Sequence, residues 1–183
     1  IRGALSPTGE QQPSMEMRPV TAGYFKAMGI PIVRGRAFQA SDAMSSPQVV
    51  IISEAAARKY FAGEDPIGRV ITMGYGREKG KPQPGGEIVG VDADVKDRGL
   101  AYDAPPQVYL PFAQMPISSM DVLLRTQVDP MTLAKSVEAV VHELDRELPL
   151  GRVRTLDALM AASVSQPRLY ALLLGFLASA PVS

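Results

Sequence analysis

The only histidine of the chain, His142, is the first residue to consider as a catalytic group, because an imidazole titrates near neutral pH. It falls on the polar side of an expected helix, near Glu138 and Asp145, where a histidine is typically solvated. The sequence G-x-S-x-G, which presents the serine nucleophile of many hydrolases, does not occur, and the chain contains no cysteine. Zinc rarely accepts carboxylates alone, so one histidine is a poor basis for a zinc site. We therefore predict no catalytic residue.

Two further stretches contain residue types that bind ligands, and neither completes a motif. The segment "GYGREKGKP" is similar to a phosphate-binding loop, but Tyr75 stands where the motif needs its first glycine and Pro82 where it needs serine or threonine. Asp92, Asp94 and Asp97 lack the glycine and the distal glutamate of a calcium loop. We therefore predict a hairpin tip, acidic residues that flank a strand end in solvent, no cofactor and no metal.

The charge balance of the chain argues against nucleic acid as a partner. The 19 lysines and arginines equal the 19 aspartates and glutamates, so no net charge favours an anionic partner. The locally basic stretch "GREKGK" has no interleaved aromatic residues on which bases stack. The absence of cysteine excludes disulfides and leaves the redox compartment open.

The first half of the chain predicts two strand–helix segments. Residues 14–35 have the pattern of a strand, a short helix and a strand, with Thr21 as the helix N-cap and Gly29 as its left-handed end. The apolar run 49–52 predicts a strand buried on both faces. Ser53 then caps a helix that ends at Gly63, and strands follow over residues 69–73 and within "EIVGVDADV".

The second half predicts another strand–helix–strand unit, over residues 121–155, after a strand in "QVYLPF". Its helix begins at Asp129 as N-cap with Pro130 at the first position, and its apolar residues follow three-and-four spacing. Its strands are "DVLLRT" and "RVRTL", and "LDALMAASV" predicts a further short helix. The two units, 14–35 and 121–155, predict an α+β fold with a split β-α-β layer and an inserted second lobe, and not a doubly wound sheet.

The terminal apolar run leaves two interpretations open. It extends from Leu169 to Ala178, about half of the roughly twenty residues that span a bilayer core. It is either a buried or interfacial helix, or a truncated span with Arg168 and Tyr170 at the water interface. The first residues, 1–13, lack the pattern of a signal peptide and are expected to form an exposed lead-in.

The order of several phrases resembles a known family. These phrases are "VTAGYFKAMGIPIVRGRAF", "VVIISEAAARKYFAGEDPIGRVI", "EIVGVDADVKDRGL", "PQVYLPF" and "VRTLDALMAASVSQPRLYALLLGFLA". Together they are similar to the extracytoplasmic core domain of MacB-like ABC transporter permeases, in the duplicated-permease branch of the FtsX/MacB superfamily. The resemblance covers residues 15–178. The closing "SAPVS" departs from it, because the family continues with an apolar stretch there.

The resemblance implies an organisation and a location. It implies a porter-like lobe over residues 14–46 and 105–165, an inserted α/β lobe over 47–104, and the start of a truncated transmembrane helix over 166–183. The domain of this family lies on the periplasmic side of the cytoplasmic membrane, between the first and second transmembrane helices of the permease.

The function implied is that of a non-catalytic module that couples cytoplasmic ATP hydrolysis to movement outside the membrane during export. Its partners would be a cytoplasmic ABC ATPase, a second permease protomer or pseudo-symmetric half, and a periplasmic adaptor or cargo. We expect the coupling around residues 156–164 and Gln166–Pro167, and partner contacts at "GIPIVRGRAF" and the 74–86 hairpin. The alternatives are a periplasmic interaction or sensing module that transports nothing, or a soluble hydrolase or ligand-binding domain.

Overall fold

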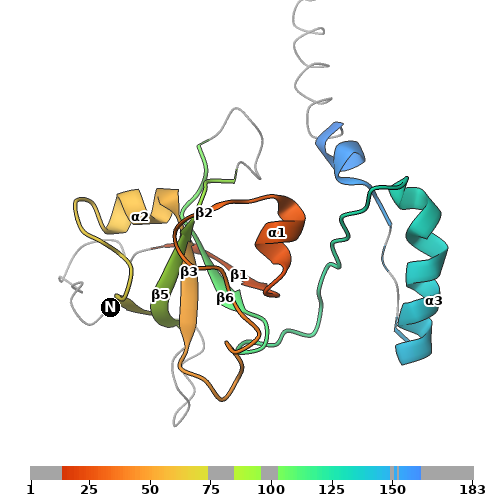
Figure 1. The fold of residues 1–183 in the computed structure, drawn as a ribbon, viewed down its shortest axis with the longest axis horizontal. Helices are drawn as coiled ribbons and strands as arrows, with labels where there is room; N and C mark the ends of the chain where they lie inside the picture. Colours follow the sequence, from red (N-terminus) through yellow and green to blue (C-terminus); the bar gives the residue numbers. More distant parts are fainter. Residues whose placement is uncertain (1–13, 74–84, 96–102, 149–150, 152, 162–183) are drawn as a thin grey trace, which may run out of the picture. The chain divides into compact units, whose positions relative to one another are not determined.

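The computed structural model describes residues 14–73, 85–95, 103–148, 151 and 153–161. Contacts within the chain divide it into two compact units, Ile1–Leu123 and Leu124–Ser183, which are called unit 1 and unit 2 below. Unit 1 contains a six-stranded mixed sheet and two short helices (Figure 1). Unit 2 contains the longest helix among the described residues. The α+β class predicted from the sequence is confirmed.

The sheet of unit 1 has the order β1-β6-β3-β5-β2, and β4 also pairs with β5. The strands are β1 (Glu16–Val20), β2 (Ile32–Gly35), β3 (Val49–Ser53), β4 (Val70–Thr72), β5 (Gly85–Asp92) and β6 (Gln107–Pro111). β3 runs parallel to β5 and antiparallel to β6, while β1 runs parallel to β6. β2 and β4 are antiparallel to β5. Every residue of β3 is buried, as the continuous apolar run predicts.

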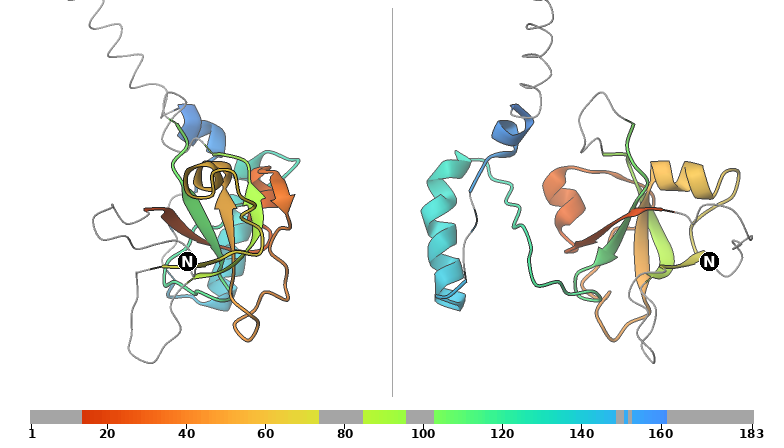
Figure 2. Two further views of the ribbon diagram at one scale, coloured as in Figure 1. Left: turned by 90° about the vertical axis from the view of Figure 1, so that its left-hand side faces the viewer. Right: turned by 180° about the vertical axis from the view of Figure 1, so that it is seen from behind.

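The two helices of unit 1, α1 (Tyr24–Met28) and α2 (Glu54–Tyr60), lie on opposite sides of the sheet (Figures 1 and 2). Successive strand residues point to opposite faces, so β3 contributes to two cores. Ile51 packs with Phe25 and Tyr109 beside α1, whereas Ile52 packs with Ala56 of α2. Each face of the sheet is therefore covered by its own helix and its own apolar cluster.

The helix ends follow the local sequence signals with one exception. Gly29 ends α1 in the left-handed conformation, with φ of 72°, as predicted. The prediction of Thr21 as N-cap is wrong: Gly23 holds that position, and Thr21 only accepts the Tyr24 N–H through its backbone carbonyl, at 3.0 Å. Ser53 caps α2 as predicted, but the helix ends earlier than predicted, with Phe61 as its C-cap.

Among the described strands, β1 is the outermost on one side of the sheet, next to β6. The Glu16 N–H donates to the Pro106 carbonyl at 2.9 Å, and the Phe112 N–H donates to the Val20 carbonyl at 2.8 Å. Residues 16, 18 and 20 therefore direct their backbone groups toward β6, and Pro19 directs its backbone nitrogen away from it.

Unit 2 contains a 3₁₀ turn, η1 (Pro130–Leu133), that continues into α3 (Ala134–Leu144). The Asp129 carboxylate accepts the Met131 N–H at 2.9 Å, so the predicted helix start is confirmed. A further helical segment begins at residue 156 and is described as far as 161. The described residues of 121–126 and 153–155 form no strand, contrary to the prediction, because a strand needs a hydrogen-bonded neighbour and no described segment supplies one.

The sheet joins segments that the sequence assigned to different lobes. β1, β2 and β6 come from the segments predicted as one lobe, and β3 and β5 come from the predicted insertion. The buried run of β3 requires a neighbour on each side, and β6 and β5 supply them. The sheet therefore includes strands from both sides of residues 46 and 47, and the division into a porter-like lobe and an inserted lobe stays a prediction.

Candidate functional site

The largest group of buried polar side chains in the described residues lies where β3 and β5 end and β6 begins. Ser53 and Asp92 are the last residues of two parallel strands and are paired across them, and Gln107 is the first residue of the neighbouring antiparallel strand. All three are almost completely buried. Because carboxyl ends of parallel strands meet at one edge of a sheet, this is the place to look for function in such a fold. The three residues, with Tyr109 and Asp94, are called the strand-end cluster.

The Ser53 hydroxyl is occupied by two backbone groups. It accepts the Ala56 N–H at 3.2 Å, which caps α2, and the Gln107 N–H at 3.0 Å, which ties β6 to β3. A hydroxyl oxygen has two acceptor positions, and both are used here. Ser53 is therefore a structural link between a helix and a strand, and its oxygen is not presented to a substrate.

Asp94 stabilises the start of α2 from outside the helix. Its carboxylate accepts the Ala55 N–H at 2.6 Å and forms an ion pair with Arg58 on the next turn. An anion at the positive end of a helix is favourable. The hydrogen bond with Asp94 raises the pKa of Arg58, so the guanidinium keeps its positive charge.

Asp92 is the exception in the cluster, because its carboxylate is buried with no hydrogen-bond partner among the described residues. Burial raises the pKa of Asp92 to about 7, and the nearby negative charges of Asp94 and Glu54 act in the same direction. The neighbouring Tyr109 hydroxyl donates its single proton to Gln107 Oε1, at 2.5 Å. Burial also raises the pKa of Tyr109, which therefore stays neutral.

The prediction that the acidic residues beside this strand end are solvated is wrong for Asp92. As the last residue of β5, Asp92 pairs with Ile32 on one side and Ser53 on the other, so the sheet itself covers it. Asp94 is partly exposed, and Asp97 lies outside the described residues. Within the described part of the chain, no three histidine, cysteine, aspartate or glutamate side chains are placed to hold a metal ion.

A second polar group holds the loop of residues 36–48, which follows β2. The Arg36 guanidinium binds both oxygens of the buried Asp42, at 2.8 and 3.0 Å, and the Gln39 N–H donates to the same carboxylate at 2.8 Å. The hydrogen bond with Arg36 lowers the pKa of Asp42. The loop thus carries its own ion pair, in which Asp42 is buried and Arg36 is partly exposed.

The same loop is tied to the end of β6 by Gln114. Its amide oxygen accepts the Val49 N–H at 3.1 Å, and its amide nitrogen donates to the carbonyls of Ala43 and Pro47, at 3.2 and 2.9 Å. No sequence pattern marked Gln114, because its partners lie 65 to 71 residues away along the chain. We call these contacts and the Arg36–Asp42 pair the loop brace.

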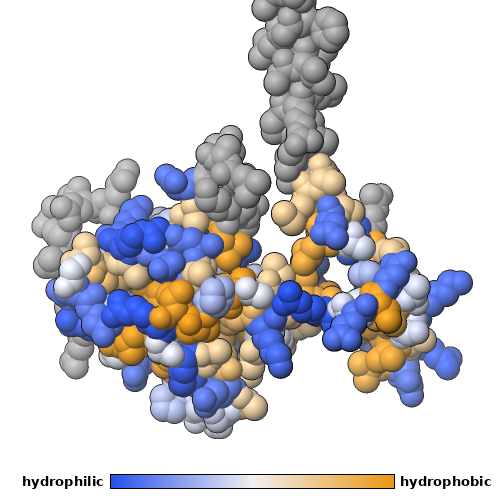
Figure 3. Space-filling model, turned by 45° about the horizontal axis from the view of Figure 1, so that its top comes forward, coloured by the Kyte–Doolittle hydropathy of each residue, from blue (hydrophilic) through white to orange (hydrophobic). Residues whose placement is uncertain are grey.

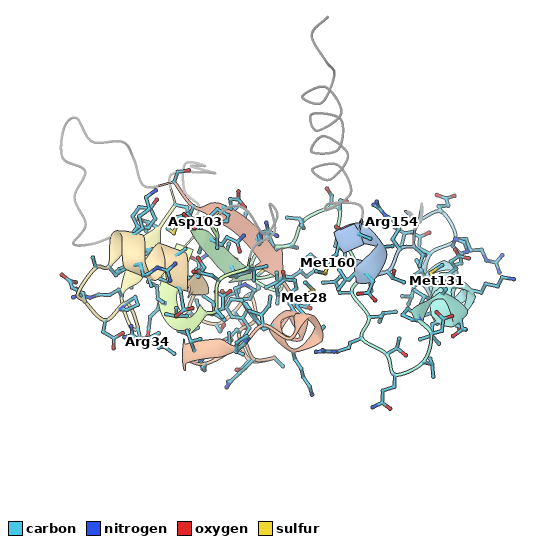
Figure 4. The ribbon with its side chains drawn as sticks, turned by 90° about the horizontal axis from the view of Figure 1, so that it is seen from above. Met28, Arg34, Asp103, Met131, Arg154 and Met160 are labelled. Atoms are coloured by element: carbon cyan, nitrogen blue, oxygen red, sulfur yellow. The ribbon has the colours of Figure 1, made fainter. Side chains whose placement is uncertain are left out.

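The surfaces predicted for partner contact are only partly described. In "GIPIVRGRAF", Phe38 is buried in the core, whereas Val33 and Arg34 are exposed. Arg34, labelled in Figure 4, forms a surface ion pair with Asp65 at 2.5 Å. Residues 74–84 of the predicted hairpin, residues 162–164 of the predicted coupling helix, Gln166–Pro167 and the terminal apolar run lie outside the described residues. His142 is exposed on α3, as predicted.

Hydrophobic side chains are visible at the surface of both units in the view of Figure 3. The exposed hydrophobic residues of unit 2 include Val140 and Leu144 of α3, and also Met131 and Met160, which are labelled in Figure 4. None of the helices in the described part of the chain has the length and apolar character needed to cross a bilayer.

Comparison with known proteins assigns the family. The family model of the MacB-like periplasmic core domain matches residues 3–140. The chain belongs to this family. No curated protein matches it.

Among solved structures, the periplasmic region of MacB from Actinobacillus actinomycetemcomitans is similar to this MacB-like chain, with a TM-score of 0.50 and 20% identity. The match covers 70% of the chain and 56% of the MacB region, so the chain spans little more than half of that region. It supports the fold alone.

Two further structures match less well. The extracellular domain of the noncanonic ABC-type transporter YknZ from Gram-positive bacteria has a TM-score of 0.39 at 24% identity, and covers 52% of the chain and 42% of that domain. A domain of a protein described as a permease, from Porphyromonas gingivalis, has a TM-score of 0.43 at 18% identity, and covers 78% and 68%.

Proposed function

We propose that this MacB-like domain works outside the cytoplasmic membrane as the non-catalytic part of an ABC transporter permease, and that it transmits movement driven by ATP hydrolysis in the cytoplasm. The observation that carries the proposal is the family match over residues 3–140. In the complete protein, residues 166–183 would begin a transmembrane helix. The partners would be a cytoplasmic ABC ATPase, a second permease protomer or pseudo-symmetric half, and an adaptor or cargo on the periplasmic side.

The architecture of unit 1 suits a part that moves as a rigid body. Its central strand β3 is buried on both faces, and an apolar cluster lies on each side of the sheet. The strand-end cluster and the loop brace fix the two ends of β3, at Ser53 and Val49. A rigid-body movement requires a stiff element, because packed cores transmit displacement instead of absorbing it.

The chemistry of the polar groups also supports a role without catalysis. The Ser53 oxygen is occupied by two backbone N–H groups, and the Arg36 guanidinium by Asp42 and the Ala37 carbonyl. Catalysis needs a nucleophile or base with a free position directed at a substrate. These side chains are instead committed to holding strands and loops.

The proposal can be tested by distance measurements in the complete permease, with any cysteine outside this chain replaced; this chain itself contains none. Spin labels would be attached to Ser45→Cys in unit 1 and Glu143→Cys in unit 2, both at exposed positions. With the permease and its ATPase in lipid nanodiscs, we expect the distance distribution to change between the nucleotide-free and ATP-bound states.

The control pair is Ser45→Cys with Arg69→Cys, both exposed and both in unit 1, whose distance should stay constant. If ATP leaves the Ser45–Glu143 distance unchanged while the ATPase remains active, the proposed transmission of movement is wrong. If the control distance changes as much, unit 1 is not a rigid part.

A further inference from the structure

Asp92 is the most deeply buried ionisable group of the strand-end cluster. Both of its carboxylate oxygens are inaccessible, and neither has a hydrogen-bond partner among the described residues. Every other member of the strand-end cluster has one: Ser53 accepts two N–H groups, Tyr109 donates to Gln107, and Asp94 pairs with Arg58. A buried carboxylate without donors is costly, and the site can avoid this cost by binding a proton.

The described neighbours of Asp92 are either neutral or negatively charged. Ile32 of β2 and Ser53 of β3 flank it in the sheet. Tyr109 of β6 lies beside it, and Glu54 of α2 and the following Asp94 add negative charge. On the α1 side, Tyr24 packs against Tyr109 with ring centroids 5.9 Å apart.

The positive charges on the packed elements are engaged elsewhere. Arg58 of α2 binds Asp94, Arg34 of β2 binds Asp65, and Arg36, just after β2, binds Asp42. Arg18 of β1 binds Glu16 and acts on Tyr109, and Lys26 of α1 is exposed. None of these cations donates a hydrogen bond to Asp92.

We propose that Asp92 is a buried proton-binding site through which the junction of β3, β5, β6 and α2 responds to pH. With its proton, the carboxyl is neutral and can donate to the Tyr109 oxygen, whose own proton is directed to Gln107. Without its proton, a charge is left between Ser53 and Tyr109, whose hydroxyl can donate to it only by giving up its bond to Gln107 Oε1, and the junction loses stability. The inference does not depend on the proposed coupling function.

The direction of the pH effect follows from proton linkage. The pKa of Asp92 is about 7 in the folded chain and has its ordinary value of 3.8 when the carboxyl is solvated. The folded state therefore binds more protons between these values, and stability falls as pH rises through them. The folding equilibrium constant is expected to fall about tenfold per pH unit, about a thousandfold in all, and then to level off above pH 7.

The first test is urea unfolding of the 183-residue chain between pH 4.5 and 8.5, with wild type and Asp92→Asn compared at each pH. The amide keeps the shape of the carboxyl and carries no charge at any pH. We expect the ratio of the two folding constants, wild type over variant, to fall about a hundredfold or more across this range. An unchanged ratio would overturn the proposal.

Asp94→Asn is the matched control, because it removes a neighbouring carboxylate of the same cluster. It loses the Arg58 pair and the Ala55 contact but retains the titrating group. Its pH-dependent step should remain, displaced to lower pH, because Asp94 raises the pKa of Asp92. If the step disappears in Asp94→Asn and persists in Asp92→Asn, the assignment to Asp92 is wrong.

Two measurements on the wild-type chain keep the proposal testable should the variants fold poorly. The carboxyl ¹³C resonance of Asp92 should titrate near pH 7, and a midpoint below pH 5 would refute the assignment. Hydrogen-exchange protection of the Gln107 and Ala56 amides, both bound to Ser53, should fall more between pH 5.5 and 8.5 than that of Glu87. Glu87, at the opposite end of β5, donates its N–H to the Gln48 carbonyl and serves as the reference. An equal loss of hydrogen-exchange protection at both ends of the strand would contradict a local response.

Discussion

The strand β3 and the helix α3 have the two clearest apolar patterns of the chain, but the strand is buried and the helix is exposed. All five residues of β3 are buried between β5 and β6. α3 has no buried residue, and Val140 and Leu144 on its apolar face are 58% and 80% exposed. An apolar pattern shows which face is suited to burial, but only neighbouring segments bury it. The three predictions below test how far this difference extends into stability.

The largest expected effect comes from the middle of β3. Ile52→Ala removes a side chain that is 0% exposed and packed against α2, and should lower the free energy of unfolding by about 3 kcal/mol. Val140→Ala on α3 should change it by less than about 0.5 kcal/mol, because little burial is lost and alanine favours the helix. Urea unfolding followed by circular dichroism gives both values. Similar losses in the two variants would mean that α3 is covered in solution.

Removing the helix cap Ser53 in unit 1 should cost more stability than removing the helix cap Asp129 in unit 2. Ser53→Ala leaves two buried N–H groups, of Ala56 and Gln107, without an acceptor, and should cost about 2 kcal/mol. Asp129→Ala exposes one N–H to water at the start of η1, and should cost about 1 kcal/mol or less. Thermal unfolding of the two variants measures the difference. A larger loss for Asp129→Ala would reverse the ranking of the two regions.

The smallest expected effect is on the stability of the fold at acidic pH. Arg36 lowers the pKa of Asp42 below its ordinary value of 3.8, so the ion pair contributes stability above that value and loses it as pH falls through the lowered pKa. Asp42→Asn should therefore flatten the decline in stability below about pH 4. Asp65→Asn, which removes the exposed pair with Arg34, serves as the control and should leave the decline in place. The midpoint of urea unfolding at pH 3 to 6 tests this, and an equal flattening in both variants would argue against a special role for Asp42.

The elements that sequence reasoning predicted correctly are those specified by adjacent residues. The apolar run of β3, the Ser53 cap, the left-handed Gly29 and the Asp129–Pro130 helix start each depend on a few neighbouring residues. The α+β class followed from the predicted strand–helix–strand units, and the family phrases added the assignment that the match over residues 3–140 supports.

The features that were missed depend on distant residues. Ser53 accepts the Gln107 N–H across 54 positions, and Gln114 reaches Val49 across 65. The polar residues after Asp92 led to the prediction that it is solvated, yet β2 and β3 pair with β5 on either side of it. The strands expected at 121–126 and 153–155 fail for the converse reason, since no neighbour pairs with them in the described residues.

The orientation of Pro19 in β1 has a consequence for how the protein meets copies of itself. Its nitrogen is directed away from β6 and carries no hydrogen, so the outward rim of β1 lacks a donor at that position. An incoming strand would find a broken ladder there, which discourages fibril-like stacking of one molecule on another. Among the described strands, the proline ring thus makes this side of the sheet a poor template for the backbone of a second copy.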